Sequence, residues 1–198
     1  MQKNTVSKEK ILESALDLFS QKGYDGVGVD MIAENAGLKG PSIYKHFKSK
    51  EELLEVLIKR IDEYYNTNFG VDVKEGELPS SVDELVELSM KKIEFTLQDE
   101  VIKKTRKIFA MEQFRSPYIA KLATLHNVEK IQEMYEIIFR GMMEKGIIIQ
   151  ENPKMLAMGF VSPISLLVQV CDREPERKAE ILVEIKDYIE YFVQTIKC

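Results

Sequence analysis

Apolar residues recur at intervals of three and four along most of the chain, which is the period of one face of an α-helix. The first such face is formed by Ile11, Leu12, Ala15, Leu16 and Phe19. Ser7 is a candidate N-cap for this helix and Gly23 a stop signal. Residues 147–149 form an apolar run that is too short to support a strand. The pattern predicts an all-α fold.

Other helix starts are marked by local signals. Residues 49–52 and 81–84 each carry a serine followed three positions later by glutamate, the pattern of a capping box. Between them, residues 68–81 contain two glycines and a proline and are predicted to be a loop. Proline at the first helical position predicts three further starts, at Pro117, Pro153 and Pro175.

Charge is divided unevenly along the chain. The net charge of −5 argues by itself against a nucleic-acid partner. Residues 1–50, however, contain eight lysines and six acidic residues, a net charge of +2, which leaves −7 for residues 51–198. We therefore predict two domains, a small basic one at 1–50 and a larger acidic one at 51–198.

Residues that carry catalytic chemistry are scarce. The chain has two histidines and two cysteines, Cys171 and Cys198, and it has no glycine-rich phosphate loop. We therefore expect neither an enzyme nor a bound metal or cofactor. The cysteine usage and the polar N-terminal segment favour the cytoplasm. Residues 155–171 carry no charge, but this run of 17 residues is shorter than the roughly 20 that a spanning helix needs. We expect no membrane span there, but a helix buried on several sides.

Two short helices and a glycine turn follow the first helix. The second helix is predicted at Val29–Asn35, and Gly37 supplies the left-handed conformation that a tight turn requires. Gly40 and Pro41 open a third helix. Together these elements predict a helix-turn-helix, whose last helix enters the major groove of DNA by its N-terminal end.

The third helix carries aromatic and basic side chains. We expect Lys39, Ser42 and Lys45 to face the bases, while Ile43 and Phe47 point inward. Tyr44, His46 and Lys50 are expected to contact phosphates. The predicted DNA-binding residues are Lys39, Gly40, Pro41, Ser42, Tyr44, Lys45, His46 and Lys50. Each short pattern taken alone is as typical of core packing or a solvated face, but their position after a glycine turn in the net-basic segment favours DNA.

Residues 8–54 resemble the DNA-binding domain of the tetracycline-repressor (TetR) family. The resemblance is carried by F-x-x-x-G-Y from Phe19, I-A-x-x-A-G from Ile32 and Y-x-H-F-x-S-K-E-x-L from Tyr44. It implies a transcriptional regulator, usually a repressor, that binds a palindromic operator as a homodimer. It also implies a helical C-terminal domain that dimerises and binds a small effector.

Two positions depart from the family pattern. Family members commonly carry serine or threonine where this chain has Gly28, which can cap a helix but offers no side-chain contact. A basic residue is common where this chain has Asp30. The resemblance therefore implies that the second helix contributes little phosphate affinity here.

The uncharged run and the last helix are the predicted dimer interface. The predicted interface residues are Met158, Leu166, Ile185, Ile189 and Phe192. The apolar stripe of the last helix is wider than packing on one neighbour requires, and a two-fold interface suits a palindromic operator. The alternative is that both helices are buried inside one monomer.

Residues 82–144 are rich in Phe, Met and Tyr, which is typical either of an adaptable ligand cavity or of plain core. The predicted ligand-binding residues are Phe109, Gln113, Tyr118, His126, Met134 and Ile138. The acidic composition favours an apolar or cationic effector over an anionic one. The rival hypothesis is a DNA-binding dimer without an effector, acting in chromosome organisation or cell division.

Overall fold

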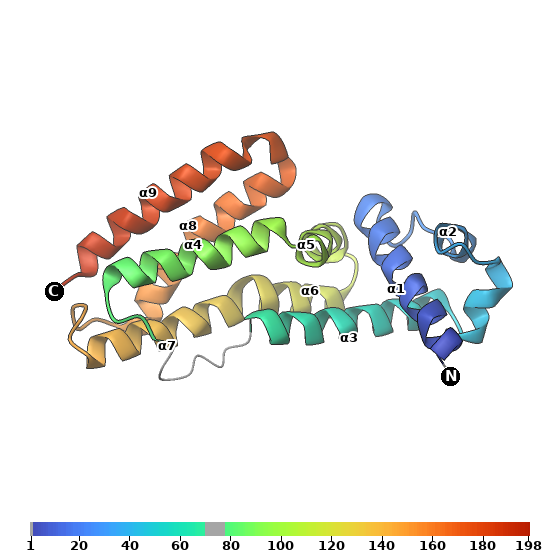
Figure 1. Cartoon of the computed structure of the whole chain (residues 1–198), viewed down its shortest axis with the longest axis horizontal. Helices are drawn as coiled ribbons and strands as arrows, with labels where there is room; N and C mark the ends of the chain where they lie inside the picture. The colour runs from blue at the N-terminus through green and yellow to red at the C-terminus, as the bar shows by residue number, and fades with distance from the viewer. Residues whose placement is uncertain (1, 70–77) are drawn as a thin grey trace. The chain divides into compact units, whose positions relative to one another are not determined.

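The computed structural model describes residues 2–69 and 78–198, with side chains for residues 7–67 and 78–198. The helices are α1 (Gln2–Lys22), α2 (Val29–Asn35), the 3-10 helix η1 (Gly40–Lys45), α3 (Lys50–Phe69), α4 (Val82–Gln98), α5 (Glu100–Glu112), α6 (Pro117–Thr124), the π-helix η3 (Leu125–Glu129), α7 (Lys130–Glu144), α8 (Pro153–Arg173), the 3-10 helix η4 (Pro175–Arg177) and α9 (Lys178–Ile196) (Figure 1). Within the described ranges, extended pairing is limited to an isolated bridge between Ile148 and Lys197. The prediction of an all-α fold is confirmed.

The chain folds into two compact units that are not continuous in sequence. Unit 1 consists of residues 1–68 and 100–123, and unit 2 of residues 69–99 and 124–198. Unit 1 thus combines the N-terminal helices with α3, α5 and α6. The division of function at residue 50 remains a prediction.

Most of the predicted helix boundaries agree with the structure. Helix α2 has the predicted bounds, and Ser49 Oγ accepts a hydrogen bond from Glu52 N at 3.2 Å, as a capping box requires. Ser81 Oγ likewise accepts from Glu84 N at 3.1 Å. The prediction that Ser7 caps the first helix is wrong, because α1 begins at Gln2 and runs through Ser7 without a break. Of the predicted loop 68–81, residues 70–77 lie outside the described residues.

Unit 2 packs around an aromatic cluster. The rings of Tyr135, Phe139, Phe160 and Phe192 lie with centroids 4.7 to 6.2 Å apart, and they come from α7, α8 and α9. The hydroxyl of Tyr135 donates to Ser89 Oγ at 2.9 Å, so that a buried polar group of α4 is satisfied. The cluster therefore joins all four long helices of this unit.

Helix α8 buries one face only. It is long and apolar enough to cross a membrane by length and composition, although core helices of soluble proteins pass the same test, and 33% of its most apolar window is buried. Ala157, Phe160 and Ile164 are buried, whereas Met158 and Leu166 are 45% and 59% exposed. The prediction of a helix buried on several sides is therefore wrong for the single chain.

The helical segment that starts at Pro117, as predicted, contains a π-turn. Helices α6 and α7 are joined through η3, where the wider turn accommodates an extra residue. His126 lies in this turn and is 3% exposed. Helical periodicity in the sequence does not reveal such an insertion, because apolar spacing on either side stays near 3.6.

Candidate nucleic-acid interface

The turn between α2 and η1 is closed at Gly37, as the sequence predicted. Gly37 has a φ of +69°, in the left-handed region. The N–H of Gly37 donates to Glu34 O at 2.9 Å, and the N–H of Leu38 donates to Ala33 O at 2.8 Å. These bonds satisfy the last carbonyls of α2 and turn the chain directly into the next element, so the predicted helix-turn-helix is present.

Helix η1, the candidate recognition element, is a 3-10 helix of six residues; the sequence predicted a third helix here without fixing its type. The N–H of Ser42 donates to Lys39 O and that of His46 donates to Ile43 O, both at 2.8 Å, and these bonds span three residues. Pro41 lies in the first turn, where its missing N–H leaves no bond unmade. The tighter coil ends at Lys45.

The exposed side of η1 carries the predicted contact residues. Ile43 and Phe47 are 1% and 2% exposed, which confirms that they point inward. Tyr44 is 60% exposed, and Lys39 and Lys45 are also exposed. Seven of the predicted residues come together on η1 and the position on either side of it, namely Lys39, Gly40, Pro41, Ser42, Tyr44, Lys45 and His46.

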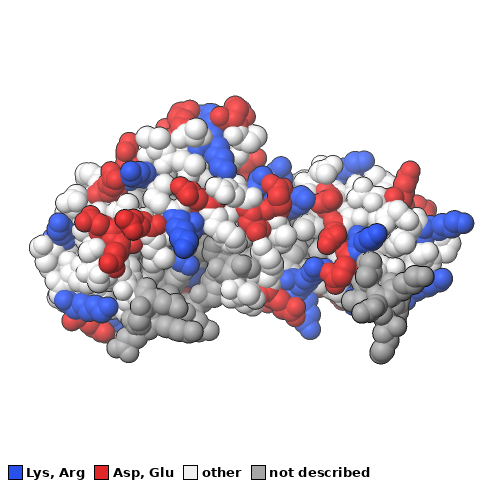
Figure 2. Space-filling model, viewed as in Figure 1, with Lys and Arg blue, Asp and Glu red and all other residues white. Residues whose placement is uncertain are grey.

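Acidic side chains are close to this surface. Asp30 Oδ1 packs so closely on Gly40 that a β-carbon at residue 40 would collide with it. Figure 2 shows Lys and Arg side chains interspersed with Asp and Glu over the face in view. Gly28 caps α2 without a side-chain hydrogen bond. The positive charge available to DNA is therefore local to η1 and its flanks. Lys8 adds to this charge, because it lies over the Phe47 ring with Nζ 5.7 Å from the ring centroid.

Lys50 has partners inside the protein. Its Nζ donates to Tyr24 O at 2.8 Å and to Val27 O at 2.9 Å, and it lies 4.0 Å from the centroid of the Tyr24 ring. The ammonium has three N–H groups, and two of them donate to these carbonyls, so that one remains for a phosphate. Lys50 thus ties the start of α3 to the turn between α1 and α2, and its predicted contact with DNA remains a prediction.

Replacing Lys50 by methionine is expected to lower the stability of the chain by about 2 kcal/mol, because two carbonyls lose a charged donor while the packed stem is retained. Thermal unfolding followed by circular dichroism measures this. Lys48→Met is the control, since Lys48 is an exposed lysine of the same segment. Unchanged stability combined with weaker DNA binding would show instead that Lys50 acts on phosphate alone.

Tyr24 joins the same turn to α3. Its hydroxyl donates to Glu51 Oε1 at 3.1 Å. Burial, with help from the bond to Glu51 and the nearby charges of Glu51 and Asp25, raises the pKa of Tyr24 to about 12. The pKa of Glu51 is lowered by its own backbone N–H, then by Ser49 and Tyr24. At neutral pH the phenol therefore stays protonated and the carboxylate ionised, which is the pairing this bond requires.

The structure divides the predicted interface residues into two groups. Met158 and Leu166 are exposed on α8 and free to meet a partner chain. Ile185 and Ile189 are 0% exposed, because they pack into the core of unit 2, and Phe192 is half-buried in the aromatic cluster. The placement of Ile185 and Ile189 at a chain–chain contact is therefore wrong, and for them the alternative of burial within one monomer holds.

The predicted ligand-binding residues are not gathered in one place by either unit. Phe109, Gln113 and Tyr118 belong to unit 1, and His126, Met134 and Ile138 belong to unit 2. Phe109, Met134 and Ile138 are buried as core, and Tyr118 is 53% exposed. A groove of about 440 Å³ runs along α7, but it is lined by other residues: Leu78, Glu133, Glu136, Ile137, Arg140, Gly141 and Glu144. Its charged lining is unlike that of a typical ligand cavity.

Comparison with known proteins finds matches to the N-terminal segment. The sequence model of the family described as bacterial regulatory proteins, tetR family, matches residues 11–57. IcaR of Staphylococcus aureus (strain Newman), a negative transcriptional regulator of the biofilm operon icaADBC, is 44% identical over 59 residues, which are 30% of this chain and 32% of IcaR. IcaR of Staphylococcus epidermidis (strain RP62A) is 29% identical over 125 residues, 48% of this chain and 68% of that protein. The chain thus matches about a third of the length of the first of these relatives.

Solved structures share the whole fold. A TetR-family regulator from Mesorhizobium loti MAFF303099 has a TM-score of 0.72 at 22% identity over 98% of both chains. SmeT, the repressor of the Stenotrophomonas maltophilia efflux pump SmeDEF, has a TM-score of 0.73 in its triclosan complex, at 18% identity over 97% of this chain and 92% of SmeT. A regulator from Saccharomonospora viridis in complex with choline has a TM-score of 0.72 at 16% identity, over 96% of this chain and 97% of that one.

The N-terminal segment with its helix-turn-helix is thus similar to the corresponding segment of bacterial regulatory proteins. Residues 11–57 match the sequence model of the tetR family, and the fold of the chain is similar to that of solved TetR-family regulators. The resemblance inferred for residues 8–54 is confirmed.

Proposed function

We propose that this chain is a transcriptional repressor that binds a palindromic operator as a homodimer and is released by a small-molecule effector. The observation that carries the proposal is the surface of η1, where Lys39, Tyr44 and Lys45 are exposed above the buried Ile43 and Phe47. An element of this size, presented at the end of a glycine turn, fits the major groove. Such a regulator acts in the cytoplasm, where the bacterial chromosome lies.

The experiment is an in vitro selection from a pool of random-sequence duplexes at low ionic strength. Successive rounds with the full chain are expected to enrich duplexes with two inverted half-sites, because two-fold protein symmetry matches two-fold DNA symmetry. A pool that stays random after repeated rounds would overturn the proposal. This enriched duplex is the selected duplex.

Replacing Lys45 by alanine is expected to weaken binding to the selected duplex about tenfold, the effect of losing one base or phosphate contact. Fluorescence anisotropy of the labelled duplex at several salt concentrations measures it. If Lys45 contacts phosphate, the salt dependence also falls by about one counterion per subunit. Lys91→Ala removes the same charge from an exposed position of α4 and is expected to bind like the wild type. Equal affinities for all three proteins would show that Lys45 does not contact DNA.

Dimerisation is proposed to use the exposed face of α8. Met155, Met158 and Leu166 are 49%, 45% and 59% exposed along this helix, with the polar but uncharged Ser162 between them. An uncharged face of this kind is unusual on the surface of a monomer and suits contact with its own copy. A dimer formed through α8 would then carry two copies of η1, one for each half-site.

Control by an effector is supported by neighbours of the same fold, whose complexes contain triclosan and choline. An apolar or cationic molecule is the class that we propose here. Triclosan and choline serve as first probes, since either one releasing the selected duplex would demonstrate effector control.

The rival, a DNA-binding dimer without an effector, is favoured by one observation. Phe109, Met134 and Ile138 are at most 4% exposed and fill core rather than line a cavity. Retention of the selected duplex in the presence of a broad set of apolar and cationic compounds would support this rival.

A further inference from the structure

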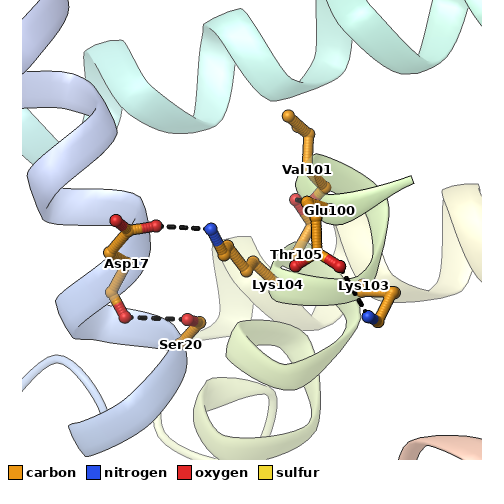
Figure 3. A network of polar contacts seen from close by, with 7 residues as sticks. All are labelled: Asp17, Ser20, Glu100, Val101, Lys103, Lys104 and Thr105. Atoms are coloured by element: carbon orange, nitrogen blue, oxygen red, sulfur yellow. Dashed lines mark hydrogen bonds and ion pairs between the residues drawn. The ribbon is translucent and has the colours of Figure 1, made fainter. Parts of the chain in front are cut away.

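Among the described residues, at least three polar contacts join α5 and the turn after it to α1 and the turn that follows α1. Lys104 Nζ lies 2.6 Å from Asp17 Oδ1, a contact seen in Figure 3, where the lysine extends from α5 toward α1. Arg115 Nη1 lies 3.4 Å from Asp25 Oδ2. Glu112 Oε1 accepts a hydrogen bond from the backbone N–H of Tyr24 at 2.8 Å. All of these residues belong to unit 1.

The three contacts differ in burial. The side chains of Lys104 and Asp17 are 30% and 41% exposed, and those of Arg115 and Asp25 are 63% and 75% exposed. Ion pairs exposed to this degree contribute little to stability. Glu112 is 4% exposed, and its Oε1 accepts from the Tyr24 N–H. The Glu112 contact is the one whose loss leaves a protein donor without an acceptor.

Gly23 makes the approach of Glu112 possible. It has a φ of +71°, which turns the chain out of α1, and a β-carbon on it would lie 3.0 Å from Glu112 Oε1. The F-x-x-x-G-Y motif therefore does two things at this point. The glycine clears space for the carboxylate, and the tyrosine presents its N–H to it.

Tyr24 is held from its other side by α3. Its carbonyl accepts from Lys50 Nζ, its ring lies beneath the same ammonium, and its hydroxyl donates to Glu51. The N–H of Tyr24 thus donates to an acceptor on α5. Its remaining polar groups bond to donors and acceptors on α3. Lys50 is four residues after His46, the residue that closes η1. The contacts of Tyr24 with Lys50 and Glu51 therefore hold the segment by which the chain leaves the recognition element.

We propose that Glu112 is a positioning residue for DNA binding, which holds the α1–α2 turn, and through Tyr24 and Lys50 the recognition element η1, in the orientation that reads DNA. The inference rests on the proposed function and adds to it a residue of α5 that does not itself contact DNA. A buried carboxylate is a poor choice for stability alone, since an apolar side chain of similar size would serve as well or better. Its directional bond to one backbone N–H fits a role in orientation.

Three substitutions at residue 112 test the proposal. Glu112→Gln keeps an oxygen that can accept from Tyr24 N, whereas Glu112→Ala removes it and Glu112→Asp keeps the charge but shortens the reach by one methylene. Lys104→Ala is the matched control, since it breaks another polar contact of α5, the one that joins it to Asp17 of α1. Binding to the selected duplex is measured by fluorescence anisotropy over a range of salt concentrations.

Glu112→Ala and Glu112→Asp are expected to weaken binding to the selected duplex about tenfold, as the loss of an acceptor to a buried donor implies. Glu112→Gln and Lys104→Ala are expected to bind within about twofold of the wild type. The salt dependence is expected to be the same in all five proteins, because no phosphate contact is removed. Thermal unfolding of each variant identifies any that fail to fold.

A second measurement needs no DNA. In the amide NMR spectrum of the free full chain, Glu112→Asp is expected to move the resonances of Tyr24, Lys50 and residues 40–45, and Glu112→Gln is not. Unmoved resonances at residues 40–45, or equal losses of affinity for Glu112→Gln and Glu112→Asp, would overturn the positioning role. Failure of the wild type to select any duplex would instead overturn the proposed function, and the NMR result would still decide whether Glu112 positions η1.

Discussion

A chain carrying Met158→Glu and Leu166→Glu is expected to be a folded monomer that binds the selected duplex at least about a hundredfold more weakly than the wild type. Both side chains are exposed on α8, so the glutamates do not disturb the core of unit 2. In a two-fold interface each new charge faces a copy of its own surface, which repels it. Without the partner, binding of the second half-site is no longer intramolecular. The affinity for the duplex therefore falls by about two to four orders of magnitude.

Sedimentation velocity gives the oligomeric state, and anisotropy with the selected duplex gives the affinity. Val128→Glu is the control, because Val128 is 43% exposed on η3 and receives the same change away from α8. It is expected to remain dimeric. A double variant that stays dimeric would place the interface on another surface.

Ile189→Asp is expected to unfold unit 2. Ile189 is 0% exposed in the hydrophobic core. As an apolar side chain it needs no polar partner there. Burying a carboxylate without a partner costs roughly 5 kcal/mol or more, which exceeds what most domains of this size can lose. Helix content by circular dichroism and the unfolding temperature measure the effect, and both are expected to fall sharply.

The matched control is Ile189→Val, which removes one methylene and is expected to cost about 1 kcal/mol. A folded, monomeric Ile189→Asp with the wild-type unfolding temperature would contradict the packing described here. Such a result would return Ile189 to the chain–chain contact that its position in the apolar stripe first suggested.

The case of Ile189 illustrates a general limit of reading the sequence. Helical periodicity identifies which side chains of α9 are buried, and Ile185, Ile189 and Phe192 are indeed at least partly buried. It does not say whether the covering surface belongs to the same chain or to a partner. On α8 the absence of charge does not mean burial within the chain, because Met158 and Leu166 remain uncovered by their own chain.

Local signals were read more accurately than long-range ones. The serine caps of α3 and α4, the left-handed Gly37 and the inward Ile43 and Phe47 each depend on residues a few positions apart. The contact between Glu112 and Tyr24 joins residues 88 positions apart. Since it depends on how α5 packs against α1, no spacing in the sequence could have indicated it.

Lys50 lies between these two cases. Its place at the start of α3 was visible, and a positive charge there suggested an anion as partner. The carbonyls of Tyr24 and Val27 reach it only because the α1–α2 turn folds back on α3. The charge was read correctly, but its nearest partners are groups of the protein itself.

Contact between DNA and the exposed side of η1 is tested most directly by titrating the isotope-labelled full chain with the selected duplex and following its amide NMR spectrum. We expect the largest changes at residues 39–46, with smaller ones at the first turn of α3 and none along α9. Residues 39–46 unmoved at saturating duplex, with the largest changes on α7 or α9, would contradict the assignment of this surface to DNA.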